Sequence, residues 1–256
     1  MIKLICLIIC IGVLLSNHGF CQAPDSASVY HVNLATVGAV IIIGSVLNVI
    51  AIKHLRKKPV ITDEELAGLN REIILPMDRW ALKQNLSHYK TISFISDYGQ
   101  IPLILIPSFL MLEKTFKKDW LKLNAMYWEG HLITFFMYNY SWLGPRFRDR
   151  YRPKVYYDDL PLSERNIGYN RSSFYSGHVA TVAFASFSMA KIYCDYTHPT
   201  DAKKTLLYGG ASLITLAEGY LKVRALAHFP SDCLVGLVLG AAIGIITPEI
   251  YKINTH

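Results

Sequence analysis

The chain has 256 residues, of which 52% are hydrophobic, and a formal net charge of +7. An apolar content above the roughly 45 to 50% of ordinary soluble domains argues against a soluble globular protein and favours one membrane-embedded domain. The positive charge suits an anionic partner, such as a nucleic acid, a phospholipid surface or a phosphorylated substrate, without choosing among them. Of the five cysteines, only Cys194 and Cys233 lie outside the N-terminal apolar stretch, so neither a disulfide framework nor a cysteine-rich metal site is indicated.

The N-terminus has the pattern of a secretory signal peptide. Lys3 forms a short basic region, residues 4–15 are apolar, and small residues precede Gln22. We expect cleavage near Cys21, because the apolar stretch is too short to span a bilayer comfortably. Residues 1–21 are then the signal, and residues 22–256 form a single membrane domain. The alternative is an uncleaved anchor.

Six apolar stretches of helical length follow in the rest of the chain. They cover residues 32–52, 91–112, 121–143, 176–193, 205–220 and 230–246. Because about 20 apolar residues span a bilayer as a helix, the predicted fold is an all-α bundle of six transmembrane helices. Counting through the six spans puts the polar clusters near their ends on the same side, which predicts one active site at one membrane face. Asp97, Glu129 and His131 within the spans are expected to face the bundle interior.

Arginine occupies every second position from Arg146 to Arg152. An extended backbone would direct all four side chains to one face. Guanidinium groups bind phosphate oxygens in a bidentate manner and stay charged at physiological pH. The pattern predicts a phosphate-binding face, and the alternative is a basic loop that only sets the membrane topology.

Two further clusters each precede a predicted helix. Ser176, Gly177 and His178 open the fourth span, where backbone N–H groups bind an anion and His178 is placed to give a proton to a leaving oxygen. His228 stands just ahead of the sixth span, and Asp232 is spaced to accept its Nδ1 proton, which leaves Nε2 as a nucleophile. Taken singly, each cluster also fits an ordinary helix cap with an interfacial histidine.

Together the three clusters resemble the signature of the phosphatidic acid phosphatase type 2 and vanadium haloperoxidase superfamily, which reads K-x6-R-P, P-S-G-H and S-R-x5-H-x3-D. The resemblance covers roughly residues 90–247, with core motifs at about 144–235. It implies that His228 attacks phosphorus, that His178 is the general acid and that Asp232 orients the nucleophile. Members of this family need neither metal nor cofactor, because arginines and helix N-termini stabilise the developing charge.

The resemblance also implies which residues bind the substrate phosphate. They are Arg152, Ser176 and Gly177 by direct match, with Arg146, Lys222 and Arg224 as the nearest basic substitutes.

Three positions depart from the family signature. Pro145 stands at the first-motif lysine, Tyr175 at the second-motif proline and Lys222 at the third-motif arginine. A lysine supplies charge but not the bidentate fork, so either phosphate affinity is lower or Arg224 takes over. The residues that make and break bonds are retained, so we expect an active enzyme.

The expected function is a membrane phosphatase that hydrolyses a phosphomonoester or diphosphate of a lipid through a phosphohistidine intermediate. Candidate substrates are phosphatidic acid, phosphatidylglycerol phosphate, undecaprenyl diphosphate and a lipid A type glycolipid, and the four arginines favour a densely anionic headgroup. We expect a multi-pass protein of a bacterial inner membrane, with the bilayer and a phosphorylated lipid as partners and no nucleic acid.

Three points stay open at this level. The distribution of basic residues puts the site on the inner face, whereas the resemblance suggests the outer face. A vanadate-dependent haloperoxidase would share the site, although such enzymes are generally soluble. An inactive family member that binds or transports lipid is the alternative from another functional class.

Overall fold

The structure is a computed structural model that describes residues 28–253. The signal peptide expected at residues 1–21 lies outside these residues. Six long helices form the described part: α2 (Leu34–Arg56), α4 (Tyr89–Leu110), α5 (Trp120–Tyr140), α7 (Gly177–Thr197), α8 (Asp201–Arg224) and α9 (Pro230–Tyr251). Two short helices and five 3-10 turns lie between them: α3 (Asp63–Ala67), η1 (Asp78–Lys83), η2 (Leu86–His88), η3 (Lys117–Asp119), η4 (Pro153–Tyr156), α6 (Leu162–Arg165) and η5 (Gly168–Arg171).

The helix ends follow local capping signals. Asn33 accepts hydrogen bonds from the backbone N–H groups of Ala35 and Thr36 at the start of α2. Ser176 caps α7 in the same manner. Pro230 occupies the first turn of α9, where its missing N–H costs no helical bond. The predicted all-α architecture is therefore confirmed for residues 28–253.

The long helices have 21 to 24 residues. A helix of that size is roughly 32 to 36 Å long, which exceeds the hydrocarbon thickness of a bilayer. Two of them, α2 and α9, are also apolar enough to cross a membrane by composition. The other four carry more polar residues, so the count of six transmembrane spans stays a prediction.

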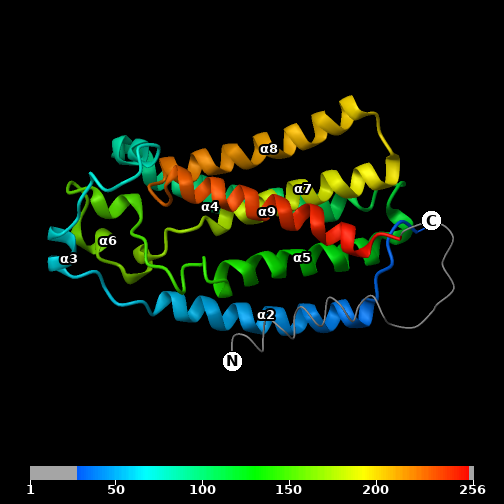
Figure 1. Cartoon of the computed structure of the whole chain (residues 1–256), viewed down its shortest axis with the longest axis horizontal. Coiled ribbons are helices and arrows are strands. Elements are labelled where there is room, and N and C mark those ends of the chain that lie inside the picture. Colours follow the sequence, from blue (N-terminus) through cyan, green and yellow to red (C-terminus); the bar gives the residue numbers. More distant parts are fainter. Residues whose placement is uncertain (1–27, 254–256) are drawn as a thin grey trace.

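Helices α7 and α9 form the centre of the bundle. Figure 1 shows them running alongside each other between α8 and α5, with α2 outermost against α5. Their backbones approach closely because glycines recur on α9: a Cβ atom at Gly236 would lie 2.5 Å from the Ser176 carbonyl oxygen, and one at Gly240 2.1 Å from that of Ala180. This packing brings the N-terminus of α9 next to the N-terminus of α7.

Large apolar side chains cover the outside of the bundle. Ile42 on α2 is 68% exposed, Phe109 on α4 66%, Leu206 on α8 75% and Val238 on α9 62%. Large exposed apolar patches are rare on soluble monomers and are typical of surfaces that contact lipid or another protein.

The long polar connections gather at one end of the bundle, on the left in Figure 1. The connection between α2 and α4 packs on the connection between α5 and α7: the Ile61 N–H donates to the Asn166 carbonyl at 2.8 Å, and Arg171 donates to the carbonyl groups of Pro59 and Val60. The end of the bundle that holds the predicted motifs is therefore covered by two layers of loop.

Candidate active site

A cavity of about 560 Å³ lies at this end of the bundle. Arg152, Gly177, His178 and His228 line it, so the fold brings residues of all three predicted motifs to one place. Its other walls include Ile52, Leu55 and Arg56 of α2, Gln100 of α4 and Phe135 of α5. The volume falls in the range of roughly 300 to 1,000 Å³ that holds small ligands in proteins.

His228 is held in one tautomer by a backbone group. Its Nδ1 atom lies 2.6 Å from the carbonyl oxygen of Ser173. A carbonyl oxygen only accepts hydrogen bonds, so Nδ1 carries the proton and Nε2 keeps its lone pair. The side chain is almost fully buried, and this burial lowers the pKa of His228 below its ordinary value of 6.5. The ring is therefore neutral near pH 7, as a nucleophile must be.

The predicted contact between Asp232 and His228 is not a hydrogen bond. Oδ2 of Asp232 lies 3.8 Å from Nδ1, which is too long. That oxygen instead accepts from the Ser173 hydroxyl at 2.6 Å and from the Phe229 N–H at 2.8 Å. The reason is local, since an acidic residue in the first turn folds back to cap its own helix. Asp232 is thus linked to His228 indirectly, through the Ser173 hydroxyl and the Phe229 N–H.

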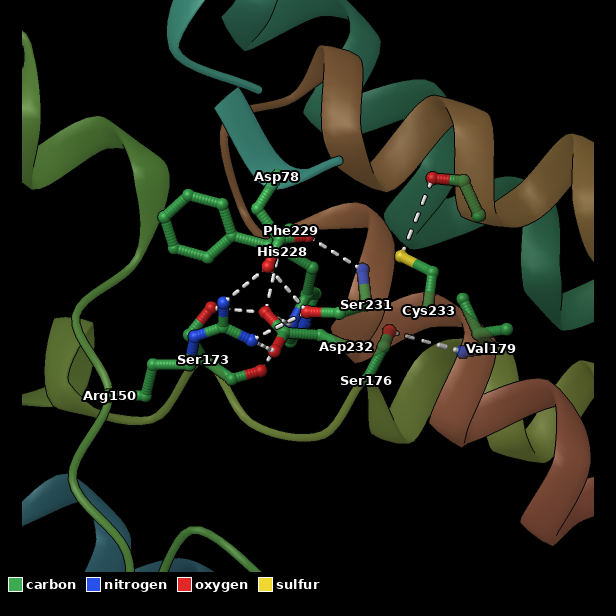
Figure 2. Close-up of polar contacts among 11 residues, drawn as sticks. Asp78, Arg150, Ser173, Ser176, Val179, His228, Phe229, Ser231, Asp232 and Cys233 are labelled. Carbon is green, nitrogen blue, oxygen red and sulfur yellow. Dashed lines mark hydrogen bonds and ion pairs between the residues drawn. The ribbon is translucent and has the colours of Figure 1, made fainter. Parts of the chain in front are cut away.

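Two residues complete this network: Asp78, which the sequence analysis missed, and Arg150, which it placed on the phosphate-binding face (Figure 2). Arg150 forms an ion pair with Oδ1 of Asp232, and its Nη2 lies 2.7 Å from Oδ2 of Asp78. Asp78 also accepts from the backbone N–H and the hydroxyl of Ser231, at 2.9 and 2.7 Å. Both carboxylates are fully buried, and the guanidinium lies 4.5 Å from the centre of the Phe229 ring. The segment between α2 and α4 is therefore anchored to the first turn of α9.

The prediction that four arginines share one phosphate-binding face was wrong. The chain turns at residues 141–147 and is extended only afterwards, so the period-two pattern does not hold across the cluster. Arg146 and Arg148 stack on aromatic rings of their own segment, and Arg150 pairs with carboxylates. Arg152 is the member that lines the cavity, and Arg146 is not brought to it.

Arg152 is placed to bind an anion. Its guanidinium stacks 4.5 Å from the centre of the Tyr169 ring, and among residues 28–253 its buried Nε atom finds no hydrogen-bond partner. A buried donor without a partner is costly unless a ligand completes it. The aromatic stack fixes the plane of the guanidinium of Arg152, which lines the cavity.

The N-terminus of α7 faces the same cavity. Ser176 is buried, caps the helix through its hydroxyl, and donates its own N–H to the carbonyl of Asp232 at 3.0 Å. Gly177 lines the cavity, where a Cβ atom would come within 3.1 Å of the Tyr138 ring. His178 follows in the first turn and also lines the cavity. Helix N-termini attract anions through their free N–H groups and dipole.

Lys222 and Arg224, the two basic residues before His228, bind other side chains. Lys222 is buried, with its Nζ atom 2.7 Å from Asp97 Oδ1 and 3.6 Å from Glu218 Oε1. Arg224 donates to the side-chain oxygen of Gln84 at 2.9 Å. Neither residue lines the cavity, so neither reaches the predicted phosphate position in this structure.

A sequence comparison identifies the family. The family model of the PAP2 superfamily matches residues 130–255. This part of the chain belongs to the PAP2 superfamily. The family predicted from the motifs is confirmed, and with it the enzyme class, a phosphatase. The PAP2 match includes Arg152, His178, His228 and Asp232, whereas α2, α4 and Asp78 lie outside it.

One solved structure similar to this PAP2 protein is the crystal structure of the first transmembrane PAP2 type phosphatidylglycerolphosphate phosphatase from Bacillus subtilis. The two are 20% identical in sequence, with a TM-score of 0.45, over 82% of this chain and 94% of that chain. No curated protein matches the chain.

Proposed function

We propose that the protein is a multi-pass membrane phosphatase that removes a phosphate group from a lipid through a phosphohistidine on His228. The observation that carries the proposal is the hydrogen bond between His228 Nδ1 and the Ser173 carbonyl. It leaves Nε2 unprotonated in the cavity that His178 and Arg152 also line.

In the first half of the reaction the Nε2 lone pair of His228 attacks phosphorus. The N–P bond forms as the bond from phosphorus to the leaving oxygen breaks, and His178 donates a proton to that oxygen. Arg152 and the N–H groups at the start of α7 stabilise the negative charge on the other phosphate oxygens. The Nδ1 proton remains on the ring, hydrogen-bonded to Ser173.

In the second half a water molecule attacks the phosphohistidine. His178, now neutral, takes a proton from this water as the new P–O bond forms and the N–P bond breaks. Inorganic phosphate leaves, and both histidines return to their starting protonation states. Asp232 and Arg150 keep the loop that carries His228 in place throughout.

The apolar walls of the cavity support a lipid as the substrate. Ile52 and Leu55 of α2 and Phe135 of α5 line it together with the two histidines. The exposed apolar faces of the helices and the length and composition of α2 and α9 support a chain embedded in a bilayer. A membrane lipid whose tail lies against α2 would present its phosphate to His228.

Within the lipid class, the site favours a monophosphate headgroup. Four arginines on one face would suit a diphosphate, but Arg152 is the member of that cluster that lines the cavity. Arg152 and the N-terminus of α7 suit a single phosphate group, and Arg56 of α2 is a second arginine that lines the cavity. Phosphatidic acid and phosphatidylglycerol phosphate are therefore better candidates than undecaprenyl diphosphate.

The test is phosphate release by the detergent-purified protein from phosphatidic acid, phosphatidylglycerol phosphate and undecaprenyl diphosphate. His228→Ala should abolish release, whereas His31→Ala, which alters an exposed histidine before α2, should not. A turnover of lipid labelled in its phosphate group, quenched under alkaline conditions, should leave labelled phosphate on the wild-type protein and none on His228→Ala. Equal release by wild type and His228→Ala would refute the proposal, and lipid binding without release would favour a non-catalytic family member.

A further inference from the structure

We propose that Asp97 of α4 is a positioning residue that holds Lys222 and the imidazole of His178 as one unit. The general acid of the reaction would then depend on a helix outside the region that matches the PAP2 family. This inference rests on the proposed function, because it assigns a role in proton donation by His178.

Lys222 is paired with two acidic side chains. Its side chain is only 2% exposed, and its Nζ atom lies 2.7 Å from Asp97 Oδ1 and 3.6 Å from Glu218 Oε1. A buried ammonium group without counter-charges would be strongly unfavourable. Glu218 is itself fixed by the Ser96 hydroxyl at 2.8 Å. The lysine at the family's arginine position is thus tied to two acids, and α4 contributes one of them.

The Asp97 oxygen that pairs with Lys222 also faces His178. Asp97 Oδ1 lies 3.6 Å from His178 Nε2, which is too long for a hydrogen bond and short enough for a strong charge interaction. The other oxygen of Asp97 accepts from the Ser93 hydroxyl at 3.2 Å, so the carboxylate is held from both sides.

Several charged groups surround His178. Three basic groups act on it: Lys222 from α8, Arg152 from the segment before η4, and His228 from the loop before α9. Positive neighbours favour loss of a proton from an imidazole, and a negative neighbour favours its retention. The Asp97 carboxylate is a negative neighbour of His178, so it opposes the effect of these basic groups.

The packing of α4 explains why this residue can act there. Helix α4 packs on both α7 and α8. Asp97 and Gln100 are three residues apart, so they lie on one face of α4, and Gln100 lines the cavity. The side chains of Asp97 and His178 are 48% and 34% exposed, so a substrate can reach the pair.

This role predicts an effect that depends on the leaving group. A lipid alkoxide is a poor leaving group and needs a proton, whereas the phenolate released from p-nitrophenyl phosphate is stable without one. General acid catalysis contributes roughly 100- to 10,000-fold, so partial loss in Asp97→Asn should lower kcat on a lipid phosphate about 10- to 100-fold. The aryl phosphate rate should fall less than about 3-fold on the same reasoning. The basic limb of the kcat profile should also move to lower pH.

The experiment compares the ratio of aryl to lipid phosphate turnover in the full-length protein in detergent. The matched control is Asp201→Asn, which removes an acid that is 97% exposed and pairs with Lys204 at the far end of α8, and it should leave both rates unchanged. His228→Ala, run in parallel, tests the phosphatase reaction itself. If His228→Ala abolishes both rates while Asp97→Asn lowers both equally without a pH shift, the positioning role is refuted and the phosphatase function stands.

A second variant covers the case in which Asp97→Asn does not fold. Asp97→Asn combined with Lys222→Met and Glu218→Gln removes the buried cation together with both of its acids, so no unpaired charge remains. The ratio of aryl to lipid phosphate turnover should still rise in this triple variant, because His178 has lost the carboxylate that holds it. A ratio equal to that of wild type would overturn the inference.

Discussion

The Nδ1 atom of His228 lies 2.6 Å from the backbone carbonyl oxygen of Ser173, which makes a peptide group the direct partner of the imidazole. The carboxylate of Asp232 does not hydrogen-bond the ring; it accepts hydrogen bonds from the Ser173 hydroxyl and the Phe229 N–H. A backbone partner cannot be removed by a side-chain substitution. The consequences of mutating Asp232 and Ser173 should therefore differ.

Asp232→Ala should be far more damaging than Ser173→Ala. The first change leaves Arg150 without one of its buried partners and should lower the free energy of unfolding by about 3 to 5 kcal/mol. The second removes one hydrogen bond, worth about 1 kcal/mol, and keeps the carbonyl that binds Nδ1. Thermal unfolding in detergent and single-turnover phosphate release measure both effects. Equal losses in the two variants would contradict the indirect role of Asp232.

Asp78→Ala should reduce both stability and activity although it lies outside the three motifs. It removes the acid that binds Arg150 and the first turn of α9. Loss of a buried ion-pair partner costs about 3 to 5 kcal/mol. Asp158→Ala is the control, because that carboxylate is 79% exposed in its ion pair with Arg165, and its unfolding midpoint should match wild type. An unchanged midpoint for Asp78→Ala would disprove the anchoring role.

Arg152→Ala should weaken phosphate binding, whereas Arg148→Ala should not. Arg152 lines the cavity, while Arg148 stacks on Trp142 with its guanidinium 3.9 Å from the ring centre. Charge-assisted hydrogen bonds contribute about 1.5 to 3 kcal/mol, so the inhibition constant for vanadate should rise about 10- to 100-fold in Arg152→Ala. Arg152→Lys should recover part of this loss, because it keeps the charge without the fork. Equal inhibition of both alanine variants would rule out Arg152 as the phosphate ligand.

The acid limb of kcat/KM should lie below pH 6.5. The nucleophile must be neutral, and burial lowers the pKa of His228 from 6.5. A lowered pKa means that protonation, and with it the loss of activity, begins only at a pH below that of an exposed histidine. The measurement is initial rate against pH at low substrate concentration. An acid inflection above 6.5 would indicate that another group limits the reaction.

Gly240→Ala should disrupt the contact between α7 and α9. The added Cβ would lie 2.1 Å from the Ala180 carbonyl oxygen, so the helices must separate. Overpacking of this kind costs about 1 to 3 kcal/mol, and activity should fall because both histidines sit at the ends of these helices. Gly209→Ala on α8 meets no atom within 4 Å, and it should leave stability equal or raise it by up to about 1 kcal/mol. Similar melting temperatures for the two variants would contradict the close packing.

Local sequence signals were sufficient to predict the long helices and three residues that line the cavity. Apolar runs of about 20 residues and local caps such as Asn33, Ser176 and Pro230 depend on near neighbours, so the six long helices could be predicted within a few residues. The motif spacing identified His178, His228 and Arg152, which do line one cavity. These features needed no knowledge of how distant segments meet.

The partners of these residues depend on long-range packing. The turn at residues 141–147 scatters the arginine cluster, the packing of α7 on α9 brings the Ser173 carbonyl to His228, and Asp78 and Asp97 arrive from segments far away in the chain. Buried charges must find a partner wherever the fold provides one, and such pairings follow no sequence period. For this reason the proposed catalytic residues could be predicted from their motifs, while the residues that hold them could not.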